Sequence, residues 1–280
     1  MKLTLFGGID KLLRERGMRG LTDFCVSAGL DGIEGYNCAG LTTADEAKAL
    51  RKLLDDAGLS CPCFSVGADL AADFGPTLDA LKRYMDMASI LGADKLHHTL
   101  VPWLKVPGVT APRFNELFDT VAERAGQVCD MAAKQGLTVL YEGQGYYFNG
   151  ADRMERLLGA LNRPNAGICA DVGNPLFVDE DPRTFVGRLM PYVRHVHLCD
   201  YMVRSADAPE FGAQYRSWTQ KQIKDMVCGQ GDIPLRELFI QLSRAGYDGA
   251  FALEFYSEPF EEGCRSSADY IRRLYRETIG

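Results

Sequence analysis

Four side chains of the kinds that bind metal ions lie at or beside the ends of short β-like runs. The runs are LTVLYE, AGICAD, VRHVHL and AFALEF, and the side chains are Glu142, Asp171, His197 and Glu254. Three carboxylates and one imidazole would make a site of mostly oxygen donors, which suits a divalent cation with octahedral-leaning geometry. Any one of the acids could instead cap a following helix, but four in equivalent positions favour a shared site.

The spacing of these residues indicates how the chain would bring them together. The separations are 171 − 142 = 29, 197 − 171 = 26 and 254 − 197 = 57 residues. The first two match one strand-plus-helix unit of roughly 30 residues, and the third is longer. We therefore expect the four side chains on different strands of one parallel sheet.

Eight β-rich runs bounded by turn residues occur along the chain. They occupy residues 2–6, 32–36, 61–66, 94–99, 137–142, 166–171, 193–198 and 250–255. Helical patterns lie between them, and one opens with a capping box at Thr43 and Glu46 and stops at Gly58. Strict alternation predicts a parallel sheet, and eight repeats predict a closed (β/α)8 TIM barrel, a single domain over residues 1–280. The alternative is a doubly wound open sheet, but no glycine-rich phosphate-binding fingerprint follows the first run.

Composition narrows the function classes. The chain has 280 residues, 46% of them hydrophobic, and a net charge of −7, which disfavours a nucleic-acid partner. The apolar stretch at the start of the sequence is too short for a signal peptide, and no run of about 18 apolar residues predicts a membrane span. The nine cysteines are odd in number and irregularly spaced, which fits reduced thiols and a cytoplasmic protein.

The mouth of the predicted barrel would hold further candidates for substrate contact. Two long connections, residues 99–112 with Trp103 and residues 199–232 with Arg204, leave the C-terminal ends of strands and are expected to act as lids. These two connections could instead be loops without a function at the site, or contacts in a homo-oligomer. Because side chains alternate along a strand, His195 shares a face with His197, and one residue of the pair His97-His98 faces inward. We take His98 as that residue.

The four metal-ligand side chains come from four consecutive runs, so they should form an arc with Glu142 and Glu254 at its two ends. A substrate chelated through two neighbouring oxygens would then have one glutamate on each face. This arrangement suits proton abstraction beside a carbonyl, with a metal-stabilised enediolate as intermediate, one glutamate taking the proton and the other returning it.

Five segments carry a resemblance to a known family: GLDGIEGY at 29–36, TVLYEG at 138–143, GICADVGN at 167–174, VRHVHLCD at 193–200, and GQGDIPLRELFIQLSRAGYDGAFALEF at 229–255. The chain resembles the xylose-isomerase-like TIM-barrel superfamily, in particular the sugar (phosphate) isomerase/epimerase group of carbohydrate metabolism. The resemblance implies a divalent cation, Mn²⁺ first and Mg²⁺, Co²⁺ or Zn²⁺ as alternatives, on the four ligands named above. It also implies that the two glutamates form the acid/base pair and that a sugar is the substrate.

The chain departs from the pattern of the ketose 3-epimerases in this group. Asn174 stands where a histidine is usual, Cys199 where a lysine is frequent, and Arg204 is only an approximate counterpart of a substrate-binding arginine. Asn174 could bind a sugar hydroxyl or cap the next turn.

Other reactions therefore stay open. An inosose-type dehydratase, or a related lyase that cleaves a C-linked glycoside, would use the same metal and base. A non-catalytic sugar-binding barrel is the alternative of another class. The three-zinc endonuclease branch is disfavoured because it needs many histidines and this acidic chain has 4.

Overall fold

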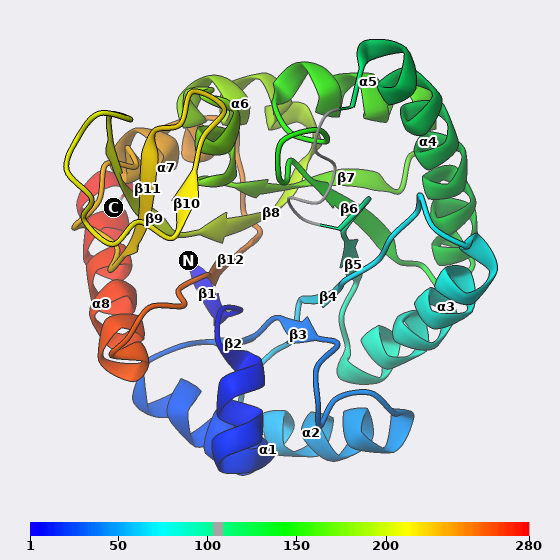
Figure 1. The fold of residues 1–280 in the computed structure, drawn as a ribbon. Coiled ribbons are helices and arrows are strands. Elements are labelled where there is room, and N and C mark those ends of the chain that lie inside the picture. The colour runs from blue at the N-terminus through cyan, green and yellow to red at the C-terminus, as the bar shows by residue number, and fades with distance from the viewer. Residues whose placement is uncertain (103–108, 280) are drawn as a thin grey trace.

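The computed structural model describes residues 1–102 and 109–279, and its centre is a parallel barrel surrounded by helices (Figure 1). The barrel strands are β1 (Lys2–Leu5), β2 (Gly32–Ile33), β3 (Gly35–Tyr36), β4 (Cys63–Val66), β5 (Lys95–His98), β6 (Thr138–Glu142), β7 (Ala166–Asp171), β8 (Val193–Leu198) and β12 (Ala250–Leu253). Their order is β2-β1-β12-β8-β7-β6-β5-β4-β3. The predicted single-domain (β/α)8 TIM barrel is confirmed.

The second predicted strand is divided into two pieces, which the sequence did not indicate. β2 pairs with β1, whereas β3 pairs with β4, and only Glu34 separates the two pieces along the chain. The two ends of the sheet are thus neighbours in sequence, and Gly32 also bridges to Ser60 beside β4. The barrel is nearly closed at this point, and Glu34 lies at the junction.

Eight α-helices among the described residues form the outer layer. They are α1 (Ile9–Ser27), α2 (Ala44–Ala57), α3 (Phe74–Leu91), α4 (Ala111–Ala133), α5 (Ala151–Leu161), α6 (Pro182–Leu189), α7 (Leu235–Arg244) and α8 (Phe260–Ile279), with 3₁₀ turns at Asn174–Val178 and Met190–Tyr192. The predicted capping box is present at α2, where the Thr43 side chain accepts from the Glu46 N–H and Gly58 ends the helix in a left-handed conformation. Within the described ranges, every helix is too short or too polar to cross a membrane.

The interior of the barrel is partly apolar and partly polar. Cys63, Leu140 and Cys169 form a small apolar cluster, separate from the large core cluster. Buried polar side chains also lie in the barrel, and Glu34 and His195 are among those with no exposed surface. Buried polar groups cost free energy unless they find partners, so this polar region needs an internal hydrogen-bond network.

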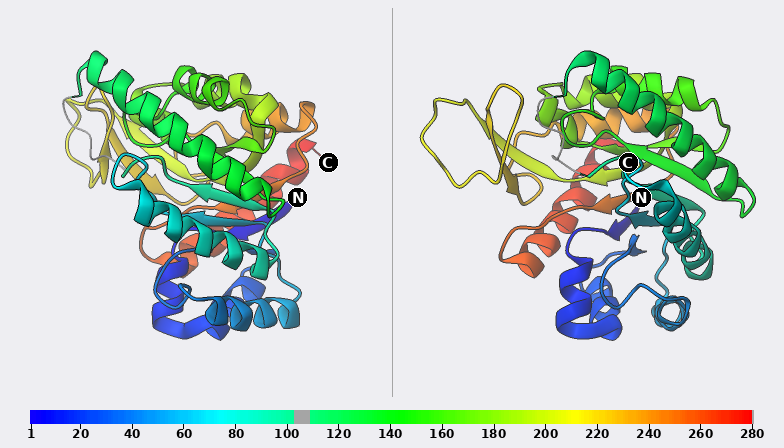
Figure 2. Two further views of the ribbon diagram at one scale, coloured as in Figure 1. Left: turned by 90° about the vertical axis from the view of Figure 1, so that its right-hand side faces the viewer. Right: turned by 45° about the vertical axis from the view of Figure 1, so that its right-hand side comes forward.

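The long connection after β8 forms a small antiparallel sheet. β9 (Asp200–Arg204) and β10 (Tyr215–Arg216) both pair with β11 (Gln222–Met226). In both views of Figure 2 this segment, coloured yellow, extends from one side of the barrel. The Tyr146 hydroxyl donates to the Arg216 carbonyl at 2.6 Å, which ties the segment to the loop after β6.

Asp200 joins the start of this insertion to its end. The carboxylate is buried and accepts backbone N–H groups from Gly229 at 2.8 Å, Gly231 at 2.9 Å and Ile233 at 3.1 Å. A Cβ atom on Gly231 would lie 2.2 Å from an Asp200 oxygen, so glycine is required for this close approach. The two motifs VRHVHLCD and GQGDIPL are therefore held together by one side chain.

We predict that Asp200→Asn destabilises the protein by about 2 kcal/mol, because the amide would direct its own N–H groups toward backbone donors. The midpoint of urea unfolding should fall, whereas Asp23→Asn on the exposed face of α1 should leave it unchanged. Equal midpoints for the Asp200 variant and the wild type would contradict this role.

Candidate metal and substrate site

Glu142, Asp171, His197 and Glu254, which we call the donor set, converge at the C-terminal mouth of the barrel. They come from the ends of β6, β7 and β8 and from the residue after β12, four neighbouring strand positions in the order β12-β8-β7-β6. One ligand atom from each lies within 4.8 Å of the others. The sheet thus brings together the four residues that the sequence pattern selected.

The imidazole of His197 occupies the centre of the donor set. Its Nδ1 lies 3.2 Å from Glu142 Oε1 and 3.4 Å from Glu254 Oε2. The ring stacks on Phe6, with centroids 4.6 Å apart. Glu142 and His197 are buried, whereas the side chain of Glu254 keeps 19% of its surface exposed. The donor set therefore opens toward solvent on the Glu254 side.

Backbone and side-chain contacts hold two of the carboxylates in place. Asp171 Oδ1 accepts the N–H groups of Gly173 at 2.7 Å and Asn174 at 2.6 Å. Glu254 Oε1 accepts the Tyr256 hydroxyl at 3.0 Å. One oxygen of each group is thus engaged by the protein, and its other oxygen stays available to a ligand.

The electrostatics of the donor set favour a bound cation. Burial raises the pKa of Glu142 to about 7 from an ordinary 4.5. Burial and the charges of Glu254 and Glu142 raise the pKa of Asp171 well above its ordinary 3.8. Burial opposes a charged His197, yet the facing Cys169, Glu34 and Glu142 groups raise its pKa well above 6.5. Crowded carboxylates need positive charge, and a divalent cation would supply it in place of protons.

A cavity of about 850 Å³ lies beside the donor set. Its walls include Glu254, Gln144 and Asn174 from the barrel and Tyr201 and Tyr215 from the insertion. A smaller cavity of about 320 Å³ shares Glu254 with it and reaches Glu142 and His97. The mouth therefore has two adjoining cavities, which the donor set borders through Glu142 and Glu254.

The structure separates the two adjacent histidines of β5. His98 is fully buried, its Nδ1 lies 3.0 Å from the Thr99 carbonyl, and its ring packs edge-on against Tyr141 in the helix-facing core. His97 instead lines the smaller cavity, with its Nε2 3.4 Å from Glu142 Oε2. The choice of His98 as a substrate contact is wrong, because the register of β5 turns His97 inward.

The remaining candidates fall in different places. Asn174 lines the larger cavity, as expected for a substrate contact. His195 is fully buried and bonds to Glu34, below the donor set and away from the cavity walls. Arg204 lies over the ring of Phe211 at 4.3 Å and is exposed, so the structure does not bring it to the mouth. Trp103 lies outside the described residues.

The most important residue that the sequence interpretation missed is Glu34. A charged residue inside the glycine-flanked run GIEGY was the available signal, since a buried acid in a strand needs a specific partner. Tyr36 and Tyr256, which line the larger cavity, were also missed. They follow strand ends in the same way as the donor set does.

The chain belongs to the xylose isomerase-like TIM-barrel family, whose model matches residues 22–274 of its 280 residues. An inosose dehydratase from Geobacillus thermodenitrificans strain NG80-2 is 26% identical over 246 residues, covering 84% of this chain and 82% of the relative.

Two solved structures establish the same fold. D-psicose 3-epimerase from Clostridium cellulolyticum H10, solved with D-tagatose, superimposes with a TM-score of 0.77 at 14% identity, covering 98% of this chain and 99% of the other. A xylose isomerase-like TIM-barrel protein from Mycobacterium smegmatis, solved in complex with magnesium, gives a TM-score of 0.71 at 18% identity, covering 94% of this chain and 89% of the other.

The raised pKa of Glu142 predicts how the stability of the cation-free protein depends on pH. Between pH 4.5 and about 7 the folded state holds a proton on Glu142 that the unfolded state releases, so this group's contribution to stability falls as pH rises. Glu142→Gln removes this contribution, and the thermal midpoint of the variant should therefore rise relative to wild type as pH rises through this window.

Thermal melts from pH 4.5 to pH 8 in the presence of a chelator measure this difference. Glu123→Gln on the exposed face of α4 is the matched control and should track wild type at every pH. A midpoint difference between Glu142→Gln and wild type that stays constant, or falls with pH, would contradict the assignment.

Proposed function

We propose that the donor set binds a divalent cation and that the protein is a metal-dependent sugar isomerase or epimerase that works by proton transfer beside a carbonyl. The observation that carries this proposal is the convergence of three carboxylates and one imidazole within 4.8 Å at the mouth of the barrel. Two of the carboxylates, Glu142 and Glu254, come from the two outer strands of the arc. A purely sugar-binding barrel would not need two bases placed in this way.

The donor chemistry supports the choice of cation. Three carboxylates and one imidazole suit Mn²⁺ or Mg²⁺ better than a soft metal, and Co²⁺ and Zn²⁺ also accept such donors. We propose Mn²⁺ as the first candidate, and the magnesium complex of the mycobacterial barrel supports a hard divalent cation in this fold. When bound, the cation would stabilise negative charge on substrate oxygens and so favour loss of a neighbouring C–H proton.

The chain's own residues would carry the proton. Glu142 is buried beside His97, and Glu254 is partly exposed beside Tyr256. A sugar lying between them presents opposite faces to the two carboxylates. One glutamate would take the proton from carbon, and the other would deliver a proton to the opposite face or to the neighbouring carbon. The result is epimerisation in the first case. In the second case it is aldose–ketose isomerisation, in which the hydroxyl proton on the deprotonated carbon also passes to the former carbonyl oxygen.

The cavity walls favour a sugar without a phosphate group. Phosphate recognition in proteins usually uses Arg or Lys side chains or clustered backbone N–H groups. Among the residues that the structure describes, the linings of both mouth cavities contain tyrosines, Gln144, Asn174 and acids but include neither Lys nor Arg. Tyrosine rings and amides are suited to sugar C–H faces and hydroxyls. We therefore propose a free ketose or cyclic polyol ketone as the substrate.

An inosose-type dehydratase is the second candidate, and the relative from Geobacillus thermodenitrificans supports it. The same base would remove the proton next to the carbonyl, but a hydroxide would then leave from the adjacent carbon. The two reactions differ in product mass, because dehydration removes one water and epimerisation leaves the mass unchanged. Mass spectrometry of reactions with D-tagatose and with inosose separates them.

The metal assignment predicts that Asp171→Asn and His197→Ala lower the affinity for Mn²⁺ more than they lower stability. Each variant loses one ligand, so affinity measured by calorimetry should fall by at least about 10-fold. The wild type should gain thermal stability from added Mn²⁺ by preferential binding to the folded state. A wild type that binds neither Mn²⁺, Mg²⁺ nor Zn²⁺ would refute the site.

The proton-transfer assignment predicts that Glu142→Gln and Glu254→Gln each lower turnover by at least about 10²-fold, because glutamine keeps the shape and removes the base. Substrate affinity should fall much less, since the cavity walls are unchanged. Incorporation of deuterium at carbon from D2O, followed by NMR, is the direct readout.

Glu258→Gln is a matched surface control, because Glu258 pairs with Lys11 away from the cavity walls. It should retain wild-type turnover. Conversion by the wild type without any exchange of carbon-bound hydrogen would indicate a hydride shift or a different reaction and would contradict the proposal.

A further inference from the structure

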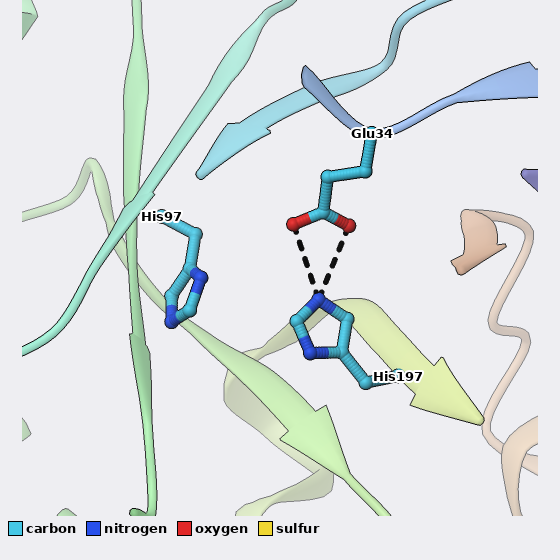
Figure 3. Close-up of side chains that lie close together, drawn as sticks. All are labelled: Glu34, His97 and His197. Carbon is cyan, nitrogen blue, oxygen red and sulfur yellow. Dashed lines mark hydrogen bonds and ion pairs between the residues drawn. The ribbon is translucent and has the colours of Figure 1, made fainter. Parts of the chain in front are cut away.

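Below the donor set, Glu34 directs both carboxylate oxygens at one nitrogen of His197 (Figure 3). We propose that Glu34 is a positioning residue that holds His197 in the tautomer and orientation needed for Nδ1 to bind the cation. The inference rests on the proposed function of the donor set and adds to it a residue that lies outside that set.

The contacts of Glu34 occupy both of its oxygens. His197 Nε2 lies 3.1 Å from each oxygen, and His195 Nε2 lies 2.5 Å from Oε2. The Ser65 hydroxyl donates to Oε1. Glu34 has no exposed surface, so these groups replace water as its only solvation within the described structure. Such a buried carboxylate is stable only because its neighbours donate to it.

The position of Glu34 indicates which nitrogen of His197 carries hydrogen, because both carboxylate oxygens face Nε2. An ionised carboxylate only accepts hydrogen bonds, so His197 Nε2 must be the protonated nitrogen that donates. Nδ1 is the atom that faces Glu142 and Glu254. When Nδ1 gives up its own proton to bind a cation, the hydrogen on Nε2 stays with Glu34.

A second branch of the same network orients His97. Because the Ser65 hydrogen goes to Glu34, the Ser65 oxygen accepts from His97 Nδ1, 2.9 Å away. The other ring nitrogen of His97, Nε2, is the one nearer the donor set. That nitrogen lies 3.4 Å from Glu142 Oε2. Glu34 thus influences two imidazoles that lie against the donor set.

The backbone explains why Glu34 reaches this position. The residue stands at the break between β2 and β3, where the two ends of the sheet meet. Pairing on either side, to β1 through Ile33 and to β4 through Gly35, fixes its Cα in the barrel wall. Phe6 stacks on the His197 ring and limits its rotation. The ring is therefore held at its face by an aromatic side chain and at its edge by a carboxylate.

A different interpretation would place a cation on Glu34, His97 and His197, whose ligand atoms also come within 4.8 Å of one another. All three side chains are buried, and Glu34 is fully enclosed, whereas the donor set opens to the cavities through Glu254. The opening through Glu254 gives a cation an entry path to the donor set, and this favours the donor set. The experiment below separates the two sites.

The test compares Glu34→Gln with His195→Gln and His197→Ala. Glutamine has the shape of glutamate but no charge, so it cannot accept from both histidines and Ser65 at once. We expect Mn²⁺ affinity, measured by calorimetry on folded protein, to fall about 10- to 100-fold in Glu34→Gln. His195→Gln perturbs the same buried network without touching the donor set directly, and its affinity should stay within about threefold of wild type. Apo-protein melts report the loss of stability of each variant separately.

A spectroscopic readout tests the tautomer itself. The chain has 4 histidines, so their ring nitrogens can be assigned by ¹⁵N NMR in protein loaded with diamagnetic Mg²⁺. The wild type should show His197 with hydrogen on Nε2, and Glu34→Gln should show exchange between tautomers or a shifted Nδ1 resonance. A purely structural role would lower the melting temperature without changing either the affinity or this spectrum.

The outcomes distinguish failure of this inference from failure of the proposed function. If His197→Ala lowers Mn²⁺ affinity and Glu34→Gln does not, the donor set stands and the positioning role is overturned. If Glu34→Gln abolishes binding while Asp171→Asn does not, the cation lies on Glu34, His97 and His197, and the inference is again overturned. If neither His197→Ala nor Asp171→Asn affects binding, the proposed metal site itself has failed.

Discussion

The placement of His197 between carboxylates on both edges of its ring is the interaction on which the rest of this site depends. Glu34 faces Nε2, and Glu142 and Glu254 face Nδ1. Both ring nitrogens can donate hydrogen bonds to these carboxylates only when the imidazole is positively charged. Facing groups, Cys169 and Glu34 first among them, raise the pKa of His197. Burial is the main cause of the raised pKa values of Glu142 and Asp171, and neighbouring carboxylates add to it.

The barrel makes this arrangement possible by dividing its interior into an apolar and a polar part. Cys63, Leu140 and Cys169 fill one part with small and medium apolar groups, while histidines, Ser65 and Glu34 form a hydrogen-bonded network in the other. A buried charge is tolerated when other groups donate hydrogen bonds to it, and here Ser65 of β4 and two histidines of β8 do so. Stability and site geometry are thus properties of the same network.

Much of this architecture was predictable from local sequence patterns, and the reasons for the failures are physical. Acids at strand ends predicted the convergence of the donor set, because parallel strands of a barrel share one mouth. The break at Glu34 was not predictable, since it depends on pairing with two strands distant in sequence. The choice between His97 and His98 failed for a similar reason, because the register of β5 decides it. The role of Arg204 stays a prediction, since its guanidinium lies over the ring of Phe211 and it does not line the two mouth cavities.

The attachment of the insertion to the barrel has a consequence for how such a scaffold can diversify. The segment containing β9, β10 and β11 leaves and rejoins the barrel at a single clamp, where Asp200 holds Gly229, Gly231 and Ile233. Two of its tyrosines, Tyr201 and Tyr215, form part of the cavity wall, but none of the donor set comes from it. Asp225 on β11 accepts the N–H groups of Tyr256 and Ser257, just beyond Glu254. Evolution or a protein engineer that keeps this contact can exchange the rest of the segment and change which molecule is admitted, while the donor set below stays in place.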